Sequence, residues 1–201
     1  MTTEPEVFQL AEHALNAVVQ AIEPDQWAMD LPANFASRAA TSPTLRELIN
    51  YHAYDDAWVP DMLAGRTMAE AGADRFDGDL LGEDPKGAFA AIVASACAAA
   101  VALSPADLDR TAHLSFGDYP VREYFWQITS FRALRAHDLA TALGFDLPLP
   151  EALVQGVWDE ISPHAEEWRS MGVFPAAVPV ADEAPLIDRL LGLTGRPTTS
   201  D

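Results

Sequence analysis

Residues 131–140 read FRALRAHDLA, and residues 51–58 read YHAYDDAW. Both segments have the composition of helices, yet both place aromatic, acidic and basic side chains where a helix inside a protein is ordinarily apolar. Polar groups in a helical interior destabilise the fold unless they are paired. A concentration of such groups on two helices therefore marks a candidate site.

Helical periodicity recurs on either side of these segments and predicts an all-α protein. Apolar residues step by three and four along residues 4–22, which predicts the first helix. Ser42, as a cap, and Pro43, in the first turn, predict the start of the second helix, and Gly65 predicts its end. Further helices are predicted over residues 85–103, 121–144, 151–170 and 184–193, with an extended crossing segment at 111–118.

Four long helices with one long crossing connection predict an antiparallel four-helix bundle over residues 1–147. Residues 148–201 follow two prolines and form a C-terminal extension of the same structural unit. The extension is predicted to hold a helix, an extended proline-rich segment and a short helix. Leucines at 186, 190 and 193 give that short helix an apolar stripe, which we expect to dock on the bundle.

Composition narrows the classes of function. The chain has 201 residues and a net charge of −19, which disfavours nucleic acid and anionic membrane surfaces as partners. Cys97 is the one cysteine and lies in an alanine-rich helix, where we expect a core residue and no disulfide. The start of the chain lacks the pattern of a signal peptide, so we expect a cytoplasmic protein acting on a small molecule, with a homodimer left open.

Several blocks resemble one family in order and spacing. They are PTLRELINY (43–51), DDAWVPDMLAG (55–65), HLSFGDYP (113–120), the DLA of 138–140 and PLIDRLLGLTGR (185–196). These blocks are similar to the DinB-like superfamily, and most of all to its actinobacterial branch related to mycothiol-dependent maleylpyruvate isomerase. The resemblance implies a DinB-like four-helix bundle. It also implies a divalent metal (zinc, nickel or manganese) that activates mycothiol or water.

The chain departs from that family at each position where the resemblance places a metal ligand. The histidine of the second helix aligns with Tyr51, and the carboxylate and histidine of the fourth helix align with Phe131 and Arg135. Phenylalanine cannot ligate a metal, and arginine does not deprotonate in proteins. We therefore predict a degenerate site with no metal. His52, about 100° round the helix from Tyr51, is the fallback ligand, with Asp55 and Asp56 beside it.

Without a metal, the same positions could form a pocket that binds its ligand through side chains alone. Arg135 would supply the positive charge and would pair with Asp138 or with Asp55 across the bundle. Tyr51, His52, Asp55, Arg135 and Asp138 are the candidate catalytic residues. Aromatic walls suited to a flat ligand would come from Tyr54, Trp58, Trp126 and Phe131. A purely structural buried ion pair is the competing interpretation.

Three functions remain open on the sequence. We expect a small-molecule pocket protein that has been repurposed to metal-free acid–base or electrostatic catalysis, with an isomerase- or transferase-like reaction. The first alternative is a divalent-metal, mycothiol-dependent transferase or isomerase, and the second is a non-catalytic binding or structural protein. A polar interior favours the first function, because a pure scaffold would be more stable with an apolar core.

Overall fold

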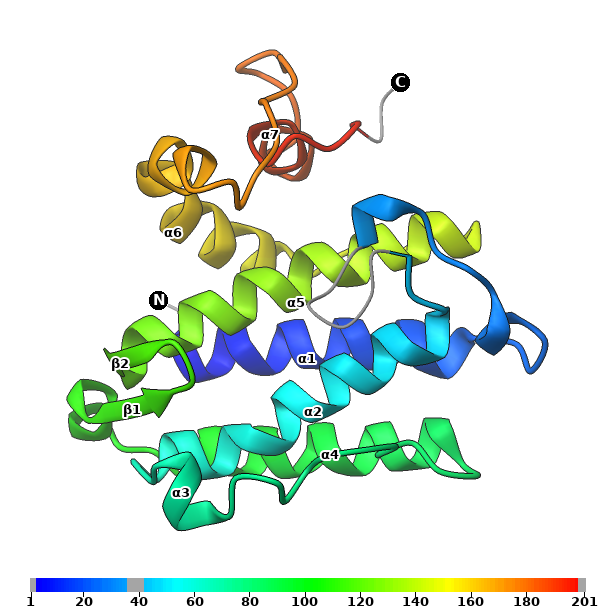
Figure 1. Ribbon diagram of the computed structural model, residues 1–201. Helices are drawn as coiled ribbons and strands as arrows, with labels where there is room; N and C mark the ends of the chain where they lie inside the picture. Colours follow the sequence, from blue (N-terminus) through cyan, green and yellow to red (C-terminus); the bar gives the residue numbers. More distant parts are fainter. Residues whose placement is uncertain (1–2, 36–41, 199–201) are drawn as a thin grey trace.

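The computed structural model describes residues 3–35 and 42–198, which fold into a mainly helical protein (Figure 1). The helices are α1 (Glu4–Ala21), α2 (Leu45–Leu63), α3 (Met68–Ala71), α4 (Pro85–Val101), α5 (Val121–Leu143), α6 (Glu151–Ser170) and α7 (Leu186–Leu193). The prediction of a mainly helical chain is confirmed, and the long helices begin and end within about two residues of the predicted bounds. None of the helices in the described ranges has the length and apolar composition needed to cross a membrane.

The second helix starts two residues later than predicted. Its N-cap is Thr44, whose hydroxyl accepts a hydrogen bond from the backbone N–H of Glu47 at 3.2 Å. The Glu47 carboxylate in turn accepts from the backbone N–H of Thr44 at 2.8 Å. This reciprocal capping box satisfies two donors at the helix start, so Ser42 and Pro43 lie before the helix and the predicted cap was wrong.

Helices α1, α2, α4 and α5 pack on one another, and α6 adds buried side chains to the same core. α1 packs against α5 on one side and α4 on the other, and α2 packs against α4 (Figure 1). Phe8 and Phe125, both fully buried, meet with their rings 5.2 Å apart at the α1–α5 contact. Burying such a side chain stabilises the fold by about 1.5–3 kcal/mol. Cys97 of α4 is buried, and burial raises the pKa of its thiol to about 12, in keeping with the core role predicted for it.

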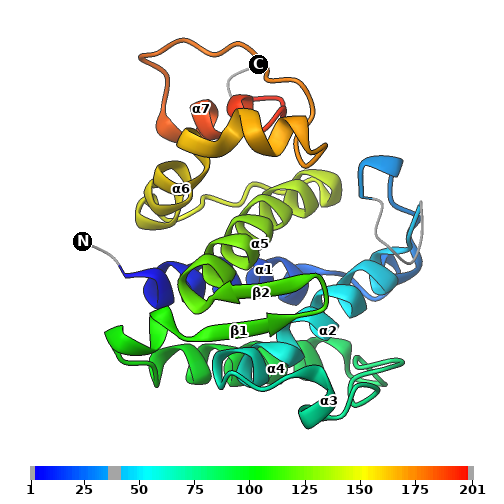
Figure 2. The ribbon, with the colours of Figure 1, turned by 60° about the vertical axis from the view of Figure 1, so that its left-hand side comes forward.

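The predicted crossing segment is a β-hairpin rather than a single extended strand. β1 (Thr111–Leu114) pairs antiparallel with β2 (Gly117–Pro120), and the hairpin lies against α5 (Figure 2). His113 and Asp118 face each other across the hairpin, and the imidazole Nδ1 lies 2.8 Å from the carboxylate. The two-residue turn at Ser115 and Phe116 was hidden from the sequence pattern because each strand has only four residues.

The C-terminal helices form a layer on one side of the long helices. α6 packs on α1 and α5, and it approaches so closely that a Cβ at Gly156 would lie 2.9 Å from the methyl groups of Val7. α7 packs on α6 rather than on the four long helices, so the predicted docking surface was wrong (Figure 1). Arg169 of α6 donates to the carbonyl of Leu193 at 2.6 Å, which holds the end of α7 against it.

Candidate functional site

An arginine on α5 is buried among acidic and histidine side chains from α1 and α2. Nε and Nη2 of Arg132 both donate to Oδ1 of Asp56, at 2.8 and 2.6 Å. Nη1 lies 3.0 Å from Nδ1 of His52, and Nε lies 3.5 Å from Oε1 of Glu12. All four side chains are at most 1% exposed, so a charged group has been taken out of water in the interior. We call these four residues the Arg132 cluster.

Local sequence explains how three helices deliver these groups to one place. Glu12 lies four residues after Phe8 and one after Ala11, on the apolar face of α1. His52 and Asp56 are four residues apart on α2 and therefore share a face. α2 and α5 are bridged here by the side chains of Arg132 and Asp56. The cluster is therefore the polar centre of an otherwise apolar core.

The surroundings of Glu12 favour its protonated form in the folded state. Burial, and next the negative charge of Asp56, raise the pKa of Glu12 well above its usual range. Neither Glu12 oxygen, nor Oδ2 of Asp56, has an N–H donor among the described residues. A protonated Glu12 that donates to Asp56 satisfies both groups at once. The cluster is then one ion pair, Arg132 with Asp56, supported by two neutral side chains.

His52 is neutral, and its hydrogen-bonding pattern can be assigned. Burial, and next the charges of Arg132 and Arg135, lower the pKa of His52 well below its usual range. Because a guanidinium only donates, Nδ1 of His52 accepts from Arg132 and the ring proton is assigned to Nε2. That Nε2–H is buried without a partner among the described residues. The ring packs against Phe131, with centroids 5.4 Å apart.

The Arg132 cluster approaches the surface along one edge between α2 and α5. Phe131 is 38% exposed there, and the Asp55 side chain is 34% exposed with Oδ2 3.7 Å from Nη2 of Arg132. Arg135 lies flat over two aromatic rings, 5.0 Å from the centre of Phe35 and 5.3 Å from that of Phe131. Burial lowers the pKa of Arg135 from its usual value, and Asp138 opposes that shift. We call Tyr51, Asp55, Phe131 and Arg135 the α2/α5 rim.

The predicted centre of the site needs correction. The cation at the centre is Arg132, one helical turn before Arg135. Asp56 is its hydrogen-bonded partner, and Asp55 lies farther from it, at 3.7 Å. Asp138 is instead held by Arg196, which follows α7 and donates from Nε and Nη2 at 2.7 and 2.9 Å. Phe131, predicted to point inward, is partly exposed. His52, predicted as a candidate catalytic residue and as the fallback metal ligand, is fully buried.

The shift along α5 has a physical reason. α5 is covered by α1 on one side and by α6 on another, so residues 132–136 are all buried and no single inward stripe exists. The family resemblance predicted Phe131 and Arg135 for the interior. In the structure, the residue that reaches Asp56 is Arg132, which lies between them in the sequence. Glu12 was missed altogether, although an acidic residue on the apolar face of the first helix was a signal that the sequence carried.

The predicted aromatic walls do not gather at one place. Trp58 stacks edge-on against Phe76 with centroids 4.9 Å apart, on the side of α2 that faces the connection to α4, and Tyr54 packs against Trp58. Trp126 lies at the contact with α6, where its ring would be 3.5 Å from a Cβ at Gly156. Of the four predicted wall residues, Phe131 is the one that lies at the α2/α5 rim.

The residues at the centre do not fit a divalent metal. A guanidinium stands between His52 and the two carboxylates, and its positive charge would repel a second cation. Across the described ranges, no three histidine, cysteine or acidic side chains are grouped closely enough to hold a metal ion. The positions that the family resemblance assigns to ligands hold Tyr51, Phe131 and Arg135, of which none is a good ligand.

No protein-family model, no curated protein and no solved structure matches this chain. The resemblance to the DinB-like superfamily therefore rests on the sequence blocks quoted above. The arguments about function rest on the geometry of the site itself.

Proposed function

We propose that this chain is a small-molecule pocket protein of the DinB-like type: an antiparallel four-helix bundle, α1, α2, α4 and α5, with a C-terminal helical extension. In this proposal it acts in the cytoplasm and binds a flat, anionic organic molecule at the α2/α5 rim. It acts on that molecule by metal-free acid–base or electrostatic catalysis, with the Arg132 cluster behind the rim as its fixed charge.

The unpartnered Nε2–H of His52 carries the proposal. A buried donor without an acceptor destabilises a protein by about 1–3 kcal/mol, so its presence calls for a compensating role. The donor belongs to a ring that packs directly on the partly exposed Phe131. A ligand that displaces the Phe131 ring would bring an acceptor oxygen to this donor.

The rim supplies the other groups that an anionic ligand needs. Arg135 offers a guanidinium whose Nε is buried without a hydrogen-bond partner in the described part of the chain. Phe131, 38% exposed beside Arg135, offers an aromatic ring to a flat molecule. Asp55 is the partly exposed carboxylate nearest Arg132 and is the candidate base. Tyr51, packed edge-on against His52, is a candidate donor at the same edge.

A structural role is the second candidate, and the closure of the Arg132 cluster favours it. With Glu12 protonated, Arg132 and Asp56 satisfy each other at 0–1% exposure without help from a ligand. In that case the cluster would fix the register of α1, α2 and α5 and would have no chemistry of its own.

Titration with cinnamate, a flat apolar monoanion, separates the two candidates. Imidazole ¹⁵N spectra report the His52 ring directly. We expect a saturable shift of the Nε2 signal with a Kd in the range of about 0.1–10 mM, because one buried donor and one guanidinium recognise the carboxylate. The Arg135→Met variant should lose this shift.

The matched control is Arg189→Met, because Arg189 also lies over an aromatic ring, 4.7 Å from the centre of Trp158, but away from the rim. Binding should be unchanged in this control. A His52 signal that does not move with cinnamate, or that moves equally in the Arg135→Met variant, would remove the ligand site and leave the structural role.

A further inference from the structure

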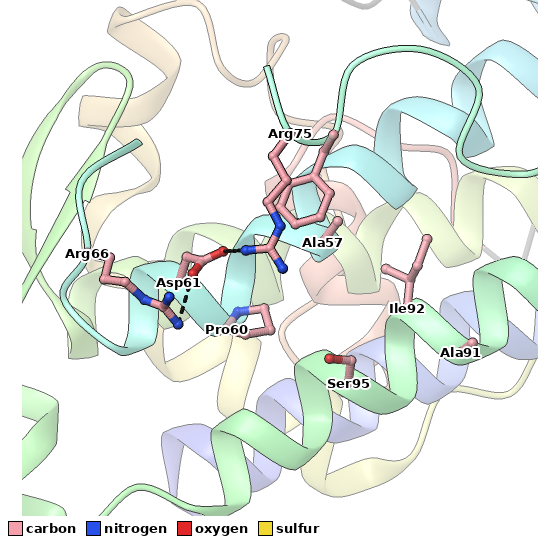
Figure 3. Close-up of a pocket in the computed structure, with 9 residues that line it drawn as sticks. Ala57, Pro60, Asp61, Arg66, Arg75, Ala91, Ile92 and Ser95 are labelled. Atoms are coloured by element: carbon pink, nitrogen blue, oxygen red, sulfur yellow. Dashed lines mark hydrogen bonds and ion pairs between the residues drawn. The ribbon is translucent and has the colours of Figure 1, made fainter. Parts of the chain in front are cut away.

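A pocket of about 380 Å³ lies on the other side of α2, between α2, the connection that follows it and α4 (Figure 3). It is lined by none of the residues of the Arg132 cluster or the α2/α5 rim. Its volume is within the usual range for small-molecule sites. The floor is built from apolar side chains of α2 and α4, among them Ala57 and Ile92, and the upper edge carries charge.

The charge comes from one buried carboxylate held between two arginines. Asp61 of α2 is 2% exposed. Nη1 of Arg75 donates to its Oδ2 at 3.2 Å, and Nη2 of Arg66 lies 3.1 Å from its Oδ1. Figure 3 shows the two guanidinium groups reaching Asp61 from two sides. At Asp61 two positive groups meet one buried negative group, in a chain whose net charge is −19.

Both arginines keep most of their hydrogen-bonding capacity. Their side chains are 54% and 52% exposed, for Arg66 and Arg75. A guanidinium has five N–H donors, and within the described residues Arg75 uses one of them, on Asp61. Glu70 interacts electrostatically with Arg66. Its carboxylate accepts hydrogen bonds from the backbone N–H and the hydroxyl of Thr67 at the start of α3. The remaining donors are therefore available to a ligand.

Contacts with Asp61 and Phe76 hold Arg75 in position, and an ion pair with Asp61 holds Arg66. Arg75 lies over the ring of Phe76, 4.9 Å from its centre, and Phe76 packs edge-on against the buried Trp58. Asp61 holds the other end of each guanidinium. Two pre-positioned guanidinium groups lose less conformational entropy on binding than two free ones, and they match the tetrahedral oxygens of a phosphate better than a single point charge does.

We propose that this pocket binds a small phosphate monoester whose apolar body rests on the floor between Phe76 and Ile92 and whose phosphate is held by Arg66 and Arg75. A dianionic phosphate fits the two guanidinium groups, and an apolar body fits the floor. Ser95, on the α4 side of the pocket, offers a hydroxyl to a polar group on that body. The proposal stands on residues separate from those of the α2/α5 rim, so either site can fail alone.

The proposal is tested by titrating the protein with phenyl phosphate and, separately, with inorganic phosphate. The readout is the NMR signals of the backbone and of the arginine Nε groups. We expect phenyl phosphate to give a saturable shift at Arg66, Arg75 and Phe76, with inorganic phosphate weaker by about tenfold because it lacks the apolar body. Arg66→Gln and Arg75→Gln should each lower the affinity for phenyl phosphate by at least about tenfold. A loss of this order is expected when a charge-assisted hydrogen bond is removed.

Arg46→Gln is the control. Arg46 is a surface arginine paired with Asp79, so its substitution removes the same charge outside the pocket. Its affinity for phenyl phosphate should match that of the unaltered protein. Arg66→Gln keeps the hydrogen bond between Arg75 and Asp61, so it retains the local fold even if Arg75→Gln does not. Equal affinity of Arg66→Gln and Arg46→Gln, or no saturable shift in the unaltered protein, would overturn the proposal.

Discussion

Helix α2 carries two arginine–carboxylate clusters of opposite design. On one side Asp56 belongs to the Arg132 cluster, where the arginine is 1% exposed and the acidic groups surround it. About 140° round the helix, Asp61 is buried and the two arginines that hold it are more than half exposed. In one cluster the cation is enclosed, and in the other the carboxylate is enclosed and the cations face water.

From this difference we infer that the burial of the arginine, rather than the number of ion pairs, decides whether a cluster mainly stabilises the fold or leaves N–H donors for a ligand. An enclosed guanidinium without its partner would cost several kcal/mol, so the Arg132 cluster is bound up with stability. Arginines at the surface are hydrated when unpaired, so the Asp61 cluster contributes little to stability and keeps its donors for other molecules.

Arg132→Met should have the largest effect. It leaves Asp56 and Glu12 buried without their cation, and we expect the free energy of unfolding to fall by about 3–5 kcal/mol. Urea unfolding followed by circular dichroism measures this change. Arg46→Met, at the surface, should change it by no more than about 1 kcal/mol. Equal effects for the two variants would mean that Arg132 is not the enclosed partner described above.

Glu12→Gln should change how stability depends on pH. The folded-state pKa of Glu12 is raised above its unfolded value of about 4.3. The stability linked to Glu12 is therefore complete below that unfolded pKa and is lost as the pH rises towards the folded pKa, by up to about 1.4 kcal/mol per pH unit. Gln resembles the protonated acid and donates to Asp56 at every pH, so the variant escapes this loss.

The measurement is urea unfolding of both proteins at several values between about pH 5 and pH 8, with the exposed Glu83→Gln as the control. The stability of Glu12→Gln relative to the unaltered protein should rise with pH, and that of Glu83→Gln should stay level. A difference for Glu12→Gln that does not change with pH would show that Glu12 is ionised in the folded protein.

Asp61→Asn should have the smallest effect of the three, in spite of the burial of Asp61. The two arginines that lose their carboxylate are exposed enough to be hydrated, so we expect a loss of about 1–2 kcal/mol. Chemical unfolding alongside Asp79→Asn, whose carboxylate is exposed, measures it. A loss as large as that of Arg132→Met would erase the contrast between the two clusters.

The helices were predictable because their signals are local. The stepping of apolar residues along residues 4–22, the proline after Asp84 and the glycine at 144 are each read within one helix, and α1, α4 and α5 begin and end close to the predicted bounds. Gly144 has a φ of 78°, a conformation that suits glycine at a helix end.

The candidate site was only partly predictable because it depends on which helices cover α5. The sequence predicted polar interior residues on α2 and α5, but on α2 the fully buried ones are His52 and Asp56 rather than the predicted Tyr51 or Asp55. It did not show which residue of α5 would meet the polar side chains of α1 and α2, and that residue is Arg132. The pocket at Asp61 was missed because it is assembled from α2, α4 and the connection between them, and no local pattern brings these together.

The Arg132 cluster also constrains the order of events during folding. Arg132 meets Asp56 and His52 across sequence separations of 76 and 80 residues, so its partners are assembled only when α2 and α5 have docked. Until then the guanidinium is better solvated by water than by an incomplete cluster. We therefore expect the apolar helix faces to collapse first and the cluster to close late, so that losing it speeds unfolding more than it slows folding.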